Sequence, residues 1–597
     1  MRKFPVPTIL SSCLFLAVSL ASAETILVDG FDSYAATKKR MGDTIDYKLA
    51  LDAGRTALVV RNSDSTQAAG VDWTIPDSLW GSVIRISILS RAQGLSQKPY
   101  PFNGVKVMLP FIRSDSTREY PQLPWPDTLP VYPWQKSSMV VTLPVNTIEA
   151  HLYLGLESVS GTVWFDSLVV ERIGSVKMPP ARDSAIPIPP SFGNTRSRGA
   201  MIGVPPDSAS IVEFGSTWKG NLLRWQMNGP YEVDSVLMQP AYESYLQKEF
   251  SYLDKGLPIC KANGIKAVID MHQMANGAFL GAAQQTLLIA TWKRIAQRYG
   301  TNPAVAGYDL ANEPDEGSWQ PGAMLWNELV DTLCRTIRSV DPNTPIVVEP
   351  AWGSVDRFSQ LRPVGSDRGW DLKNIVYSFH FYSPYELTAQ GEASDVPMGT
   401  VYPGTINGLN YDKARLRQEM QPAVDFQKRY RVPMYIGEFS CIRWAPQHSA
   451  LNWLTDVTSI LESQGWDWSY HAYREYQGWS VEYSDSMADQ RDRQNTDRKA
   501  LLLSLYAKNA NPYLATAAHP AGHRGGLEGL RWRRAGAGFV SVDGMPKGST
   551  LVVAGPDGRI IQRISMNGKS FQARSGIYWC RLTGSVNTSW EAIPLAW

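Results

Sequence analysis

The sequence lacks the features that mark several large classes of protein. Its charge is nearly balanced, with 58 Lys and Arg against 56 Asp and Glu, and the net charge of +2 predicts neither a nucleic-acid partner nor a polyanion partner. Five cysteines in 597 residues are too few for a disulfide framework, and no Cys/His spacing suggests zinc. Beyond the N-terminus no apolar stretch is long enough to span a bilayer. We therefore expect a large globular monomer with ordinary buried thiols.

The first residues read as an export signal. A short basic start, Met1-Arg2-Lys3, precedes an apolar run from Ile9 to Leu20 and the small-residue pattern Ala21-Ser22-Ala23. This combination predicts a secretory signal peptide over residues 1–23, cleaved after Ala23, and so a secreted or cell-surface protein. A lipoprotein attached through Cys13 is the alternative, which is disfavoured because that thiol lies inside the apolar run.

The mature chain divides by its hydrophobic pattern. Residues 24–173 hold short alternating runs, such as 82–88 and 161–165, broken by turn residues, which predicts a β-sandwich. Residues 174–197 are rich in proline and predict a semi-stiff, extended linker. Residues 511–524 read as a second linker, and residues 525–597 return to a β pattern and predict a small C-terminal β-sandwich.

Between these parts, residues 198–510 alternate strand-like and helix-like runs. Amphipathic helical patterns cover 287–299, 324–340 and 451–463. Eight strands over about 300 residues fit a (β/α)₈ TIM barrel, whereas a doubly wound sheet would place a Gly-rich phosphate turn early, and none is evident. The buried strand-like runs are 200–204, 222–225, 267–271, 307–311, 346–349, 375–381, 434–437 and 466–470.

Polar residues stand at the ends of these strands. In a (β/α)₈ barrel the carboxyl ends of the strands face the active site, so side chains at these positions converge on one mouth. A single glutamate after a strand is as readily a cap for the next helix, but seven such positions together argue for a site. They are Arg224, His272, Asn312, Glu313, His380, Tyr382 and Glu438.

The two glutamates of this set, Glu313 on strand four and Glu438 on strand seven, suit one chemistry in particular. Retaining glycosidases pair a protonated carboxylic acid with an ionised carboxylate about 5 Å away. We expect Arg224 and Tyr382 to keep Glu438 ionised and oriented. We also expect Asn312 to bind the sugar 2-hydroxyl and His380 to tune the proton affinity of Glu313.

In this order and spacing, residues 198–510 resemble glycoside hydrolase family 5. The similarity lies in Tyr308-Asp309-Leu310-Ala311-Asn312-Glu313-Pro314, in Gly437-Glu438-Phe439, and in Arg224, His272 and His380-Phe381-Tyr382. It implies Glu313 as acid/base, Glu438 as nucleophile, supporting roles for Arg224, His272, Asn312, His380 and Tyr382, and neither metal nor cofactor. At strand eight, where the family carries a tryptophan sugar platform, this sequence aligns His471. Either the sugar is bound differently, or Trp479, further along the same loop, replaces the platform.

Aromatic residues after the strands are candidates for stacking on sugar rings. Trp225 and Tyr385 follow strands two and six, and packing between loops is the alternative for all of these rings. We expect substrate contacts from Trp319, Trp352, Trp444, His471 and Trp479.

The flanking parts carry looser resemblances. The run 161–170 is similar to the last strands of jelly-roll carbohydrate-binding modules, with glycan binding through exposed rings or a purely structural role as alternatives. The C-terminal part resembles sorting domains of Gram-negative secretion systems, and a second sugar-binding sandwich is the alternative. The rings in question are Trp73, Trp80, Tyr100, Trp125 and Trp134.

These features predict a secreted retaining endo-β-glycanase that acts on plant polysaccharide. We expect β-1,4-glucan as substrate, with β-mannan as the alternative. The competing hypothesis, from a different functional class, is a catalytically silent glycan-binding protein built on a barrel. Binding alone would not require both glutamates together with Arg224, Asn312 and Tyr382. A purely structural or sorting role accounts for still fewer of these residues.

Overall fold

The computed structural model describes the chain from residue 23 to residue 595, with gaps. The undescribed segments are 33–46, 53, 100–101, 115–117, 124–129, 194, 204, 229–238, 273–280, 316–321, 393–395, 490–492, 514–530 and the turns between the C-terminal strands. The predicted signal peptide, residues 1–23, lies almost entirely outside the described residues. The chain divides into two compact units, residues 1–175 and 176–597.

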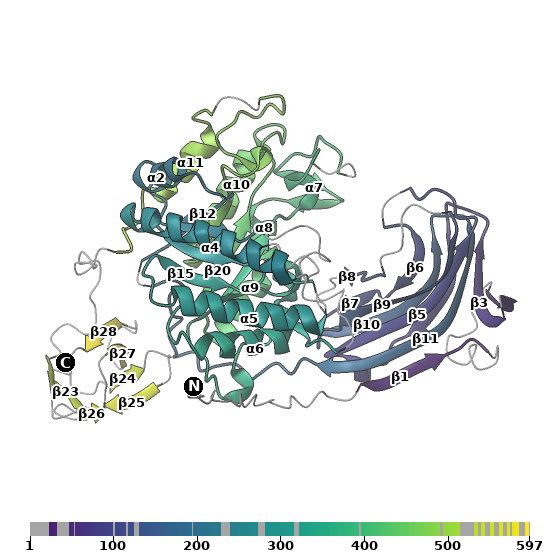
Figure 1. The fold of residues 1–597 in the computed structure, drawn as a ribbon, viewed down its shortest axis with the longest axis horizontal. Coiled ribbons are helices and arrows are strands. Elements are labelled where there is room, and N and C mark those ends of the chain that lie inside the picture. The colour runs from purple at the N-terminus through teal and green to yellow at the C-terminus, as the bar shows by residue number, and fades with distance from the viewer. Residues whose placement is uncertain are drawn as a thin grey trace, which may run out of the picture. The chain divides into compact units, whose positions relative to one another are not determined.

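The first unit is a sandwich of two antiparallel sheets (Figure 1). One sheet has the order β2-β3-β11-β5-β9 with β1 added on β11, and the other has the order β4-β10-β7-β8 with β6 added on β10. Alternate residues of the longer strands point between the sheets, as Ile84, Ile86 and Ile88 of β5 do, which confirms the predicted β-sandwich. The strands are β1 (Glu24–Asp29), β2 (Tyr47–Asp52), β3 (Arg55–Asn62), β4 (Ala68–Thr74), β5 (Ser82–Gln93), β6 (Gly104–Met108), β7 (Phe111–Arg113), β8 (Arg118–Glu119), β9 (Tyr132–Thr142), β10 (Thr147–Glu157) and β11 (Gly161–Ser175).

The second unit is built on a closed barrel of eight parallel strands. Nearly every residue of these strands is buried, because side chains of the two faces meet either the barrel interior or the surrounding helices. The predicted (β/α)₈ barrel is confirmed. Its strands are β12 (Arg198–Ile202), β13 (Leu222–Gln226), β14 (Lys266–Asp270), β15 (Val305–Asp309), β16 (Ile346–Val348), β17 (Ile375–Phe381), β20 (Met434–Phe439) and β21 (Asp467–Tyr473).

Helices surround the barrel (Figure 1). Each presents an apolar stripe to the strands, as Leu288, Trp292 and Ile295 of α5 do. A short hairpin, β18 (Gly404–Ile406) and β19 (Leu409–Tyr411), follows β17. The helices are α2 (Ser208–Ser216), α4 (Gln239–Ala262), α5 (Ala282–Tyr299), α6 (Trp326–Arg338), α7 (Tyr385–Thr388), α8 (Lys413–Glu419), α9 (Gln421–Tyr430), α10 (Ser449–Gln464) and α11 (Asp497–Tyr506).

The proline-rich stretch before the barrel packs on it, which differs from the extended spacer expected from its composition. Arg182 N–H donates to the Arg429 carbonyl, and Arg431 Nε donates to the Ile186 carbonyl. Phe192 is 4% exposed and packs edge-on against Tyr435, with ring centroids 5.0 Å apart. Because Phe192 joins a buried cluster with residues of six barrel strands, the stretch is an integral part of the barrel unit.

The C-terminal part is described by its backbone pairing. It forms a three-stranded sheet, β22-β23-β26, and a four-stranded sheet, β25-β24-β27-β28. This is the β structure that its pattern predicted. The strands are β22 (Arg531–Arg534), β23 (Phe539–Asp543), β24 (Thr550–Ala554), β25 (Ile560–Ile564), β26 (Ser570–Gln572), β27 (Gly576–Thr583) and β28 (Glu591–Leu595).

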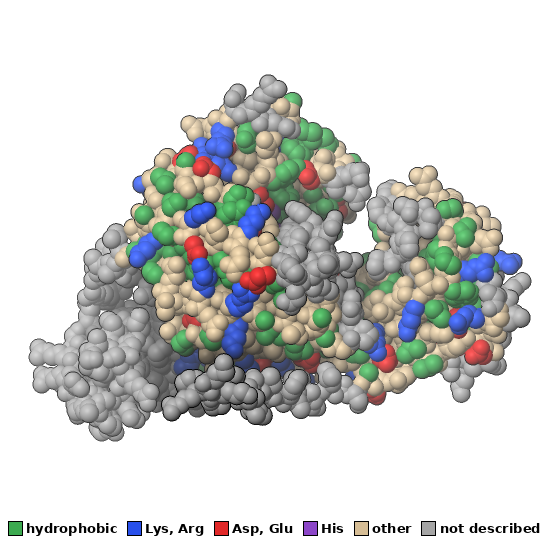
Figure 2. All heavy atoms as spheres, viewed as in Figure 1, with side chains coloured by type: hydrophobic (Ala, Val, Ile, Leu, Met, Phe, Trp, Pro, Cys, Tyr) green, Lys and Arg blue, Asp and Glu red, His purple; other side chains and the backbone are tan. Residues whose placement is uncertain are grey.

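The barrel surface mixes charges of both signs (Figure 2). Over α4 and α5, for example, Arg294 pairs with Glu243 at 2.7 Å, and Arg298 pairs with Asp254. Such interleaving agrees with the small net charge of the chain. Among the helices of the described residues, none combines the length and apolarity that crossing a bilayer requires.

Candidate active site

Arg224, at the centre of β13, organises the carboxyl end of the barrel. Its guanidinium is fully buried and donates from Nε to Asp309 Oδ2 at 2.9 Å and from Nη1 to Glu438 Oε1 at 2.5 Å. Nη2 lies 3.0 Å from Asp270 Oδ1 and 3.1 Å from Glu349 Oε1. Burial by itself would lower the pKa of Arg224, but these four carboxylates raise it well above its usual range. The arginine is therefore a permanent positive charge fixed beside Glu438.

Glu438 stands at the end of β20, 4% exposed, between several donors. The Tyr382 hydroxyl donates to its Oε2 at 2.7 Å. Burial alone would raise the pKa of Glu438, but the charges of His380, His471 and Arg224 hold that pKa well below its usual range. Glu438 is thus an ionised carboxylate in a dry site, the state that a nucleophile requires.

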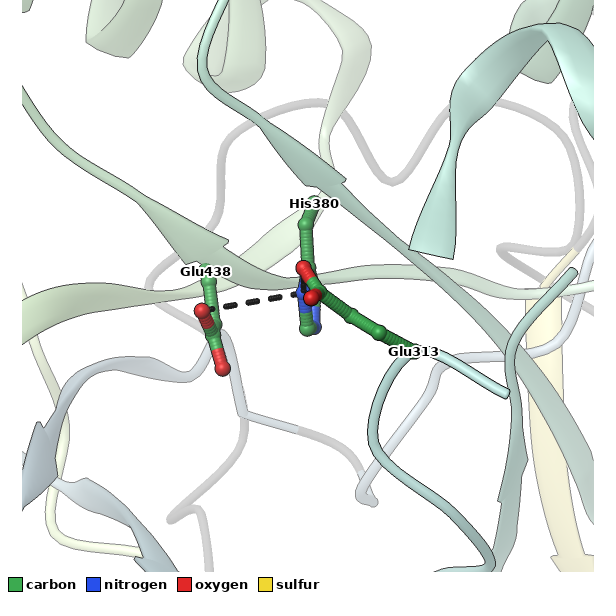
Figure 3. Close-up of side chains that lie close together, drawn as sticks. All are labelled: Glu313, His380 and Glu438. Carbon is green, nitrogen blue, oxygen red and sulfur yellow. Dashed lines mark hydrogen bonds and ion pairs between the residues drawn. The ribbon is translucent and has the colours of Figure 1, made fainter. Parts of the chain in front are cut away.

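His380, near the end of β17, lies between the two glutamates (Figure 3). Its Nδ1 is 2.7 Å from Glu313 Oε1 and 3.6 Å from Glu438 Oε2, and its Nε2 is 3.1 Å from Glu349 Oε1. Burial would lower the pKa of His380, but Glu349 and Glu438 raise it well above the usual value for histidine. A charged imidazolium therefore connects the two glutamates.

The carboxylates of Glu313 and Glu438 lie close together. One oxygen from each and a ring nitrogen of His380 all fall within 4.8 Å of one another. Glu313 remains the more accessible of the two, since its side chain is 35% exposed against 5% for Glu438. The sequence-predicted pair thus faces one small volume that is open to solvent on the Glu313 side.

The backbone around Glu313 accounts for its direction. Glu313 has a φ of 47°, in the left-handed region, and precedes Pro314, which disfavours continuing into a right-handed helix. Its N–H donates to Glu349 Oε2 at 2.9 Å, and the Pro314 carbonyl accepts from Trp352 N–H at 2.9 Å. Such a conformation costs about 1–3 kcal/mol and is held by its surroundings, as is common at active sites.

Asn312 and His272, both predicted at strand ends, contact the network around Arg224. Asn312 Oδ1 accepts from Arg224 Nη2 at 3.0 Å, which orients the amide so that its Nδ2 is the free end. His272 Nδ1 lies 2.8 Å from Asp270 Oδ2, and its side chain is 17% exposed. The structure therefore brings together all seven residues predicted at the strand ends.

His471, the residue that departs from the family pattern, is a second cation beside Glu438. It lies on β21, its Nδ1 is 3.1 Å from Glu438 Oε2, and its Nε2 is 3.3 Å from Glu475 Oε2. The Tyr382 hydroxyl lies 2.5 Å from the same Nδ1. Burial would lower the pKa of His471, but Glu438 and Glu475 raise it to about 10. The side chain is 8% exposed, so it supports the carboxylate and offers little surface to a sugar.

The aromatic candidates divide by exposure. Trp479 packs against His471 and Tyr382, with ring centroids 4.7 Å and 5.7 Å apart, and so borders the site. Trp352 is 51% exposed and lies in the short turn Ala351–Gly353 that comes after β16. Trp444 is half-buried, and its Nε1 donates to the Gln390 carbonyl at 2.7 Å.

The three remaining aromatic candidates have three different outcomes. Trp225 is fully buried on β13 against α4, which corrects its reading as a sugar platform. Tyr385 is 56% exposed. Trp319 lies outside the described residues.

Sequence reasoning missed the buried acids around Arg224. Asp270, Asp309 and Glu349 end or follow barrel strands, and all three lie within the apolar runs from which the strands were predicted, so an acid in such a run was the available signal. Burial and the neighbouring carboxylates raise the pKa of Asp309 well above its usual range. Sequence reasoning assigned no role to Gly437, whose motif it did single out. A Cβ there would lie 2.8 Å from His380 Nε2, so only glycine leaves room for the imidazole.

Glu313, His380 and Glu438 have the donor types and spacing to hold a metal ion. The environment favours a proton instead, since carboxylates face both ring nitrogens of His380 and raise its pKa. A metal would have to displace that proton, and imidazole binds metal only when neutral. The cluster therefore suits proton transfer and charge stabilisation better than metal binding.

The barrel has relatives among characterised proteins. Residues 192–476 match the family model described as cellulase, glycosyl hydrolase family 5. Endoglucanase C of Acetivibrio thermocellus is 26% identical over 278 residues, which cover 40% of this chain and 78% of that protein. Cellodextrinase A of Ruminococcus flavefaciens is 24% identical over 247 residues, which cover 39% of this chain and 70% of that protein.

A solved structure of Thermotoga maritima Cel5A in complex with cellobiose also aligns with the barrel. The alignment covers 51% of this chain and 97% of that one, at 24% identity and a TM-score of 0.42.

Proposed function

Residues 192–476 form a cellulase domain of glycoside hydrolase family 5, and from this premise we propose that the chain hydrolyses β-1,4-glucan by double displacement. The observation that carries the proposal is the approach of the two carboxylates, whose oxygens come within 4.8 Å of each other around His380. Retaining glycosidases hold their carboxyl groups about 5 Å apart, whereas inverting enzymes leave room for a water and need roughly 6.5–9.5 Å.

The surroundings of the two glutamates assign a role to each. Glu438 is buried and is held ionised by three cations, so it attacks the anomeric carbon and forms the glycosyl ester. Glu313 is more exposed and protonates the departing glycosidic oxygen. Its Oε1 faces His380 Nδ1, which leaves Oε2 to carry that proton.

The second step reverses these roles. Glu313, now ionised, takes a proton from water as the water oxygen attacks the anomeric carbon. The ester bond to Glu438 then breaks and the carboxylate returns. Arg224 donates to Oε1 of Glu438 and the Tyr382 hydroxyl donates to Oε2, so together they stabilise the negative charge that returns to the carboxylate. The product keeps the anomeric configuration of the substrate.

The substrate assignment draws on the relatives. Two of them are named as an endoglucanase and a cellodextrinase, and both match the barrel across most of their own length. β-Mannan remains the alternative, because His471 replaces the expected platform tryptophan and Trp479 stands next to it. A silent glycan-binding barrel is disfavoured, since binding would not require a buried carboxylate surrounded by three cations.

Azide rescue tests the two roles separately. With an aryl β-cellobioside whose leaving group needs no acid, Glu438→Ala should lose activity by roughly 10⁴-fold or more. Added azide should restore turnover and give the α-glycosyl azide, because it attacks from the side that the carboxylate occupied. Glu313→Ala should keep the first step, accumulate ester, and give the β-glycosyl azide.

Glu243→Gln, which removes an exposed glutamate of α4, is the matched control and should change turnover less than about twofold. The assignment is wrong if both catalytic variants give the same azide anomer. Wild-type protein that cleaves none of cellulose, mixed-linkage glucan, xyloglucan, xylan and mannan would exclude the enzyme function altogether.

We further propose that the protein is secreted. The N-terminal pattern Met1-Arg2-Lys3, the apolar run and Ala21-Ser22-Ala23 support this. A polymeric substrate cannot enter a cell, which agrees with an extracellular site of action. The C-terminal β-strands are proposed to serve in sorting, since the sequence around Gly555-Pro556-Asp557-Gly558-Arg559 resembles such domains.

A further inference from the structure

The N-terminal sandwich carries a cavity of about 350 Å³ on one sheet. Strand β10 defines the face on which it lies. Leu152, Leu154 and Leu156 of β10 are buried between the two sheets. Because side chains alternate along a strand, Glu149, His151, Tyr153 and Glu157 lie on the opposite face, and all four line the cavity.

Tyr153 lies flat on this face. Two glycines lie beneath the ring: Gly155, two residues further along β10, and Gly70, which pairs with Gly155 from the neighbouring strand β4. A Cβ on Gly70 would lie 2.5 Å from the Tyr153 hydroxyl oxygen, and one on Gly155 would lie 2.9 Å from it. The ring therefore occupies the space that two side chains would otherwise fill, and its free face points toward the cavity.

Two polar groups that can bind a ligand accompany this ring. Asp72 is the direct cross-strand neighbour of Tyr153. Within the described residues, neither the Asp72 carboxylate nor the Tyr153 hydroxyl makes a hydrogen bond. Partial burial raises the pKa of Asp72, and burial together with Glu157 and Asp72 raises that of Tyr153 to about 12. The hydroxyl is thus a donor and the carboxylate an acceptor, and neither has a hydrogen-bond partner among the described residues.

The charge of the cavity limits its ligands. Three carboxylates line it, from Asp72, Glu149 and Glu157, against two basic side chains, Arg118 and His151. Lys106 Nζ pairs with Glu157 at 2.8 Å but is itself only 3% exposed. Polymers of uronic acids would meet net like charge here, whereas neutral sugars would meet hydrogen-bonding groups.

We propose that this cavity is a second carbohydrate site, which binds a neutral pyranose polymer with one sugar ring on Tyr153 and hydroxyls on Asp72. A flat ring with free polar groups at its edge matches the apolar face and equatorial hydroxyls of a β-linked glucose unit. Tyr120, 57% exposed at the rim, adds a second ring. The class of glycan rests on the function proposed for the barrel, but the site itself does not.

This site differs from the rings that the sequence suggested for the sandwich. Trp73 and Trp80 pack partly against the sandwich core, so little of each ring is free. Trp134 lies 6.0 Å from the Arg55 guanidinium. Tyr100 and Trp125 lie outside the described residues.

Affinity electrophoresis of the full chain tests the proposal. The parent carries Glu438→Gln so that it cannot digest the hydroxyethyl cellulose in the gel. Tyr153→Ala should raise the dissociation constant for the polymer about tenfold, the scale of losing a central aromatic anchor. Tyr153→Phe, which keeps the ring, should bind within about threefold of the parent. Ile148→Ala, an exposed change on the same strand outside the cavity, is the control and should bind as the parent does.

The outcomes separate this site from the barrel. In the chain with Glu438 intact, Tyr153→Ala should hydrolyse a short aryl cellobioside at the parental rate. Equal retardation of Tyr153→Ala and Ile148→Ala would overturn the proposal, whether or not the barrel is active. Retardation that depends on Tyr153 in a protein without hydrolytic activity would support the site while contradicting the proposed function. Equal retention on polygalacturonate would overturn the neutral-glycan assignment.

Discussion

At the scale of the residue, the site is set by how charges are neutralised around Glu438. Arg224, His380 and His471 each reach this carboxylate, at 2.5, 3.6 and 3.1 Å. The attraction between buried opposite charges is strong because little water screens them. His471 is the distinctive member, since its other nitrogen faces Glu475, which helps it to keep its proton. The result is a carboxylate that stays ionised in acid, as the proposed role of Glu438 as nucleophile requires.

The substitution His471→Asn should move the acidic limb of the kcat/KM profile to higher pH. Glu438 must be ionised to attack, and it loses one of three cations that depress its pKa, so that pKa rises. Protonation then inactivates the enzyme at a higher pH than in the parent. A pH–rate profile on an aryl cellobioside measures this.

His448→Asn serves as the control for this experiment. His448 is exposed and has a left-handed backbone conformation, which asparagine also adopts readily. Its profile should coincide with that of the parent. An acidic limb that stays in place in His471→Asn would mean that His471 does not govern the ionisation of Glu438.

At the scale of the element, the closed barrel depends on a segment that precedes its first strand. Phe192 closes the amino end of the barrel with Leu222, Val268 and Val347 around it. Ser191 Oγ also donates to the Met434 carbonyl at 3.0 Å. The proline-rich chain loses little backbone entropy when it packs here, because proline already fixes φ.

Phe192→Ala should lower the free energy of unfolding of the barrel by about 3–5 kcal/mol, since it leaves a cavity among side chains that cannot collapse. The site lies at the opposite ends of the strands, so kcat/KM at low temperature should stay near the parental value. Chemical denaturation followed by tryptophan fluorescence gives the first quantity. Ser184→Ala, an exposed change in the same segment, should leave stability within about 0.5 kcal/mol. Equal stability of the two variants would contradict a structural role for Phe192.

At the scale of the whole molecule, two units with separate cores carry the active site of the barrel and the cavity proposed as a second carbohydrate site. The sandwich core and the barrel core share no residue among those described. Cys260, Cys334 and Cys441 of the barrel are unpaired and buried. Burial raises the pKa values of Cys260 and Cys334 to about 12, so the reactive thiolate is scarce. Such thiols resist oxidation, which is compatible with an extracellular protein.

Export should therefore leave these thiols intact. Protein collected from the medium should begin at Glu24, as N-terminal sequencing would measure. In a Cys580→Ser background, the native protein should react with a thiol reagent only slowly, whereas the unfolded protein should take up three equivalents. Retention in the cell with Met1 in place would contradict secretion, and fast labelling of the native protein would contradict the burial of the thiols.

The sequence by itself determined the barrel and the identity of its two glutamates. Parallel strands buried on both faces appear as short apolar runs, and in such runs Glu313 and Glu438 are conspicuous at the ends. It did not reveal Asp270, Asp309 and Glu349 as partners of Arg224, because ion pairing depends on distance in space and their spacing along the chain is irregular.

Tertiary structure alone decided what each side chain faces. An alternating strand such as β10 specifies two faces but not which one is covered, so the half-buried position of Tyr153 beside the cavity appeared only once the sheets were packed. The same holds for His471, which sequence placed at a sugar platform. Folding brings Glu438 and Glu475 to its two nitrogens, and their charges make it a buried cation instead.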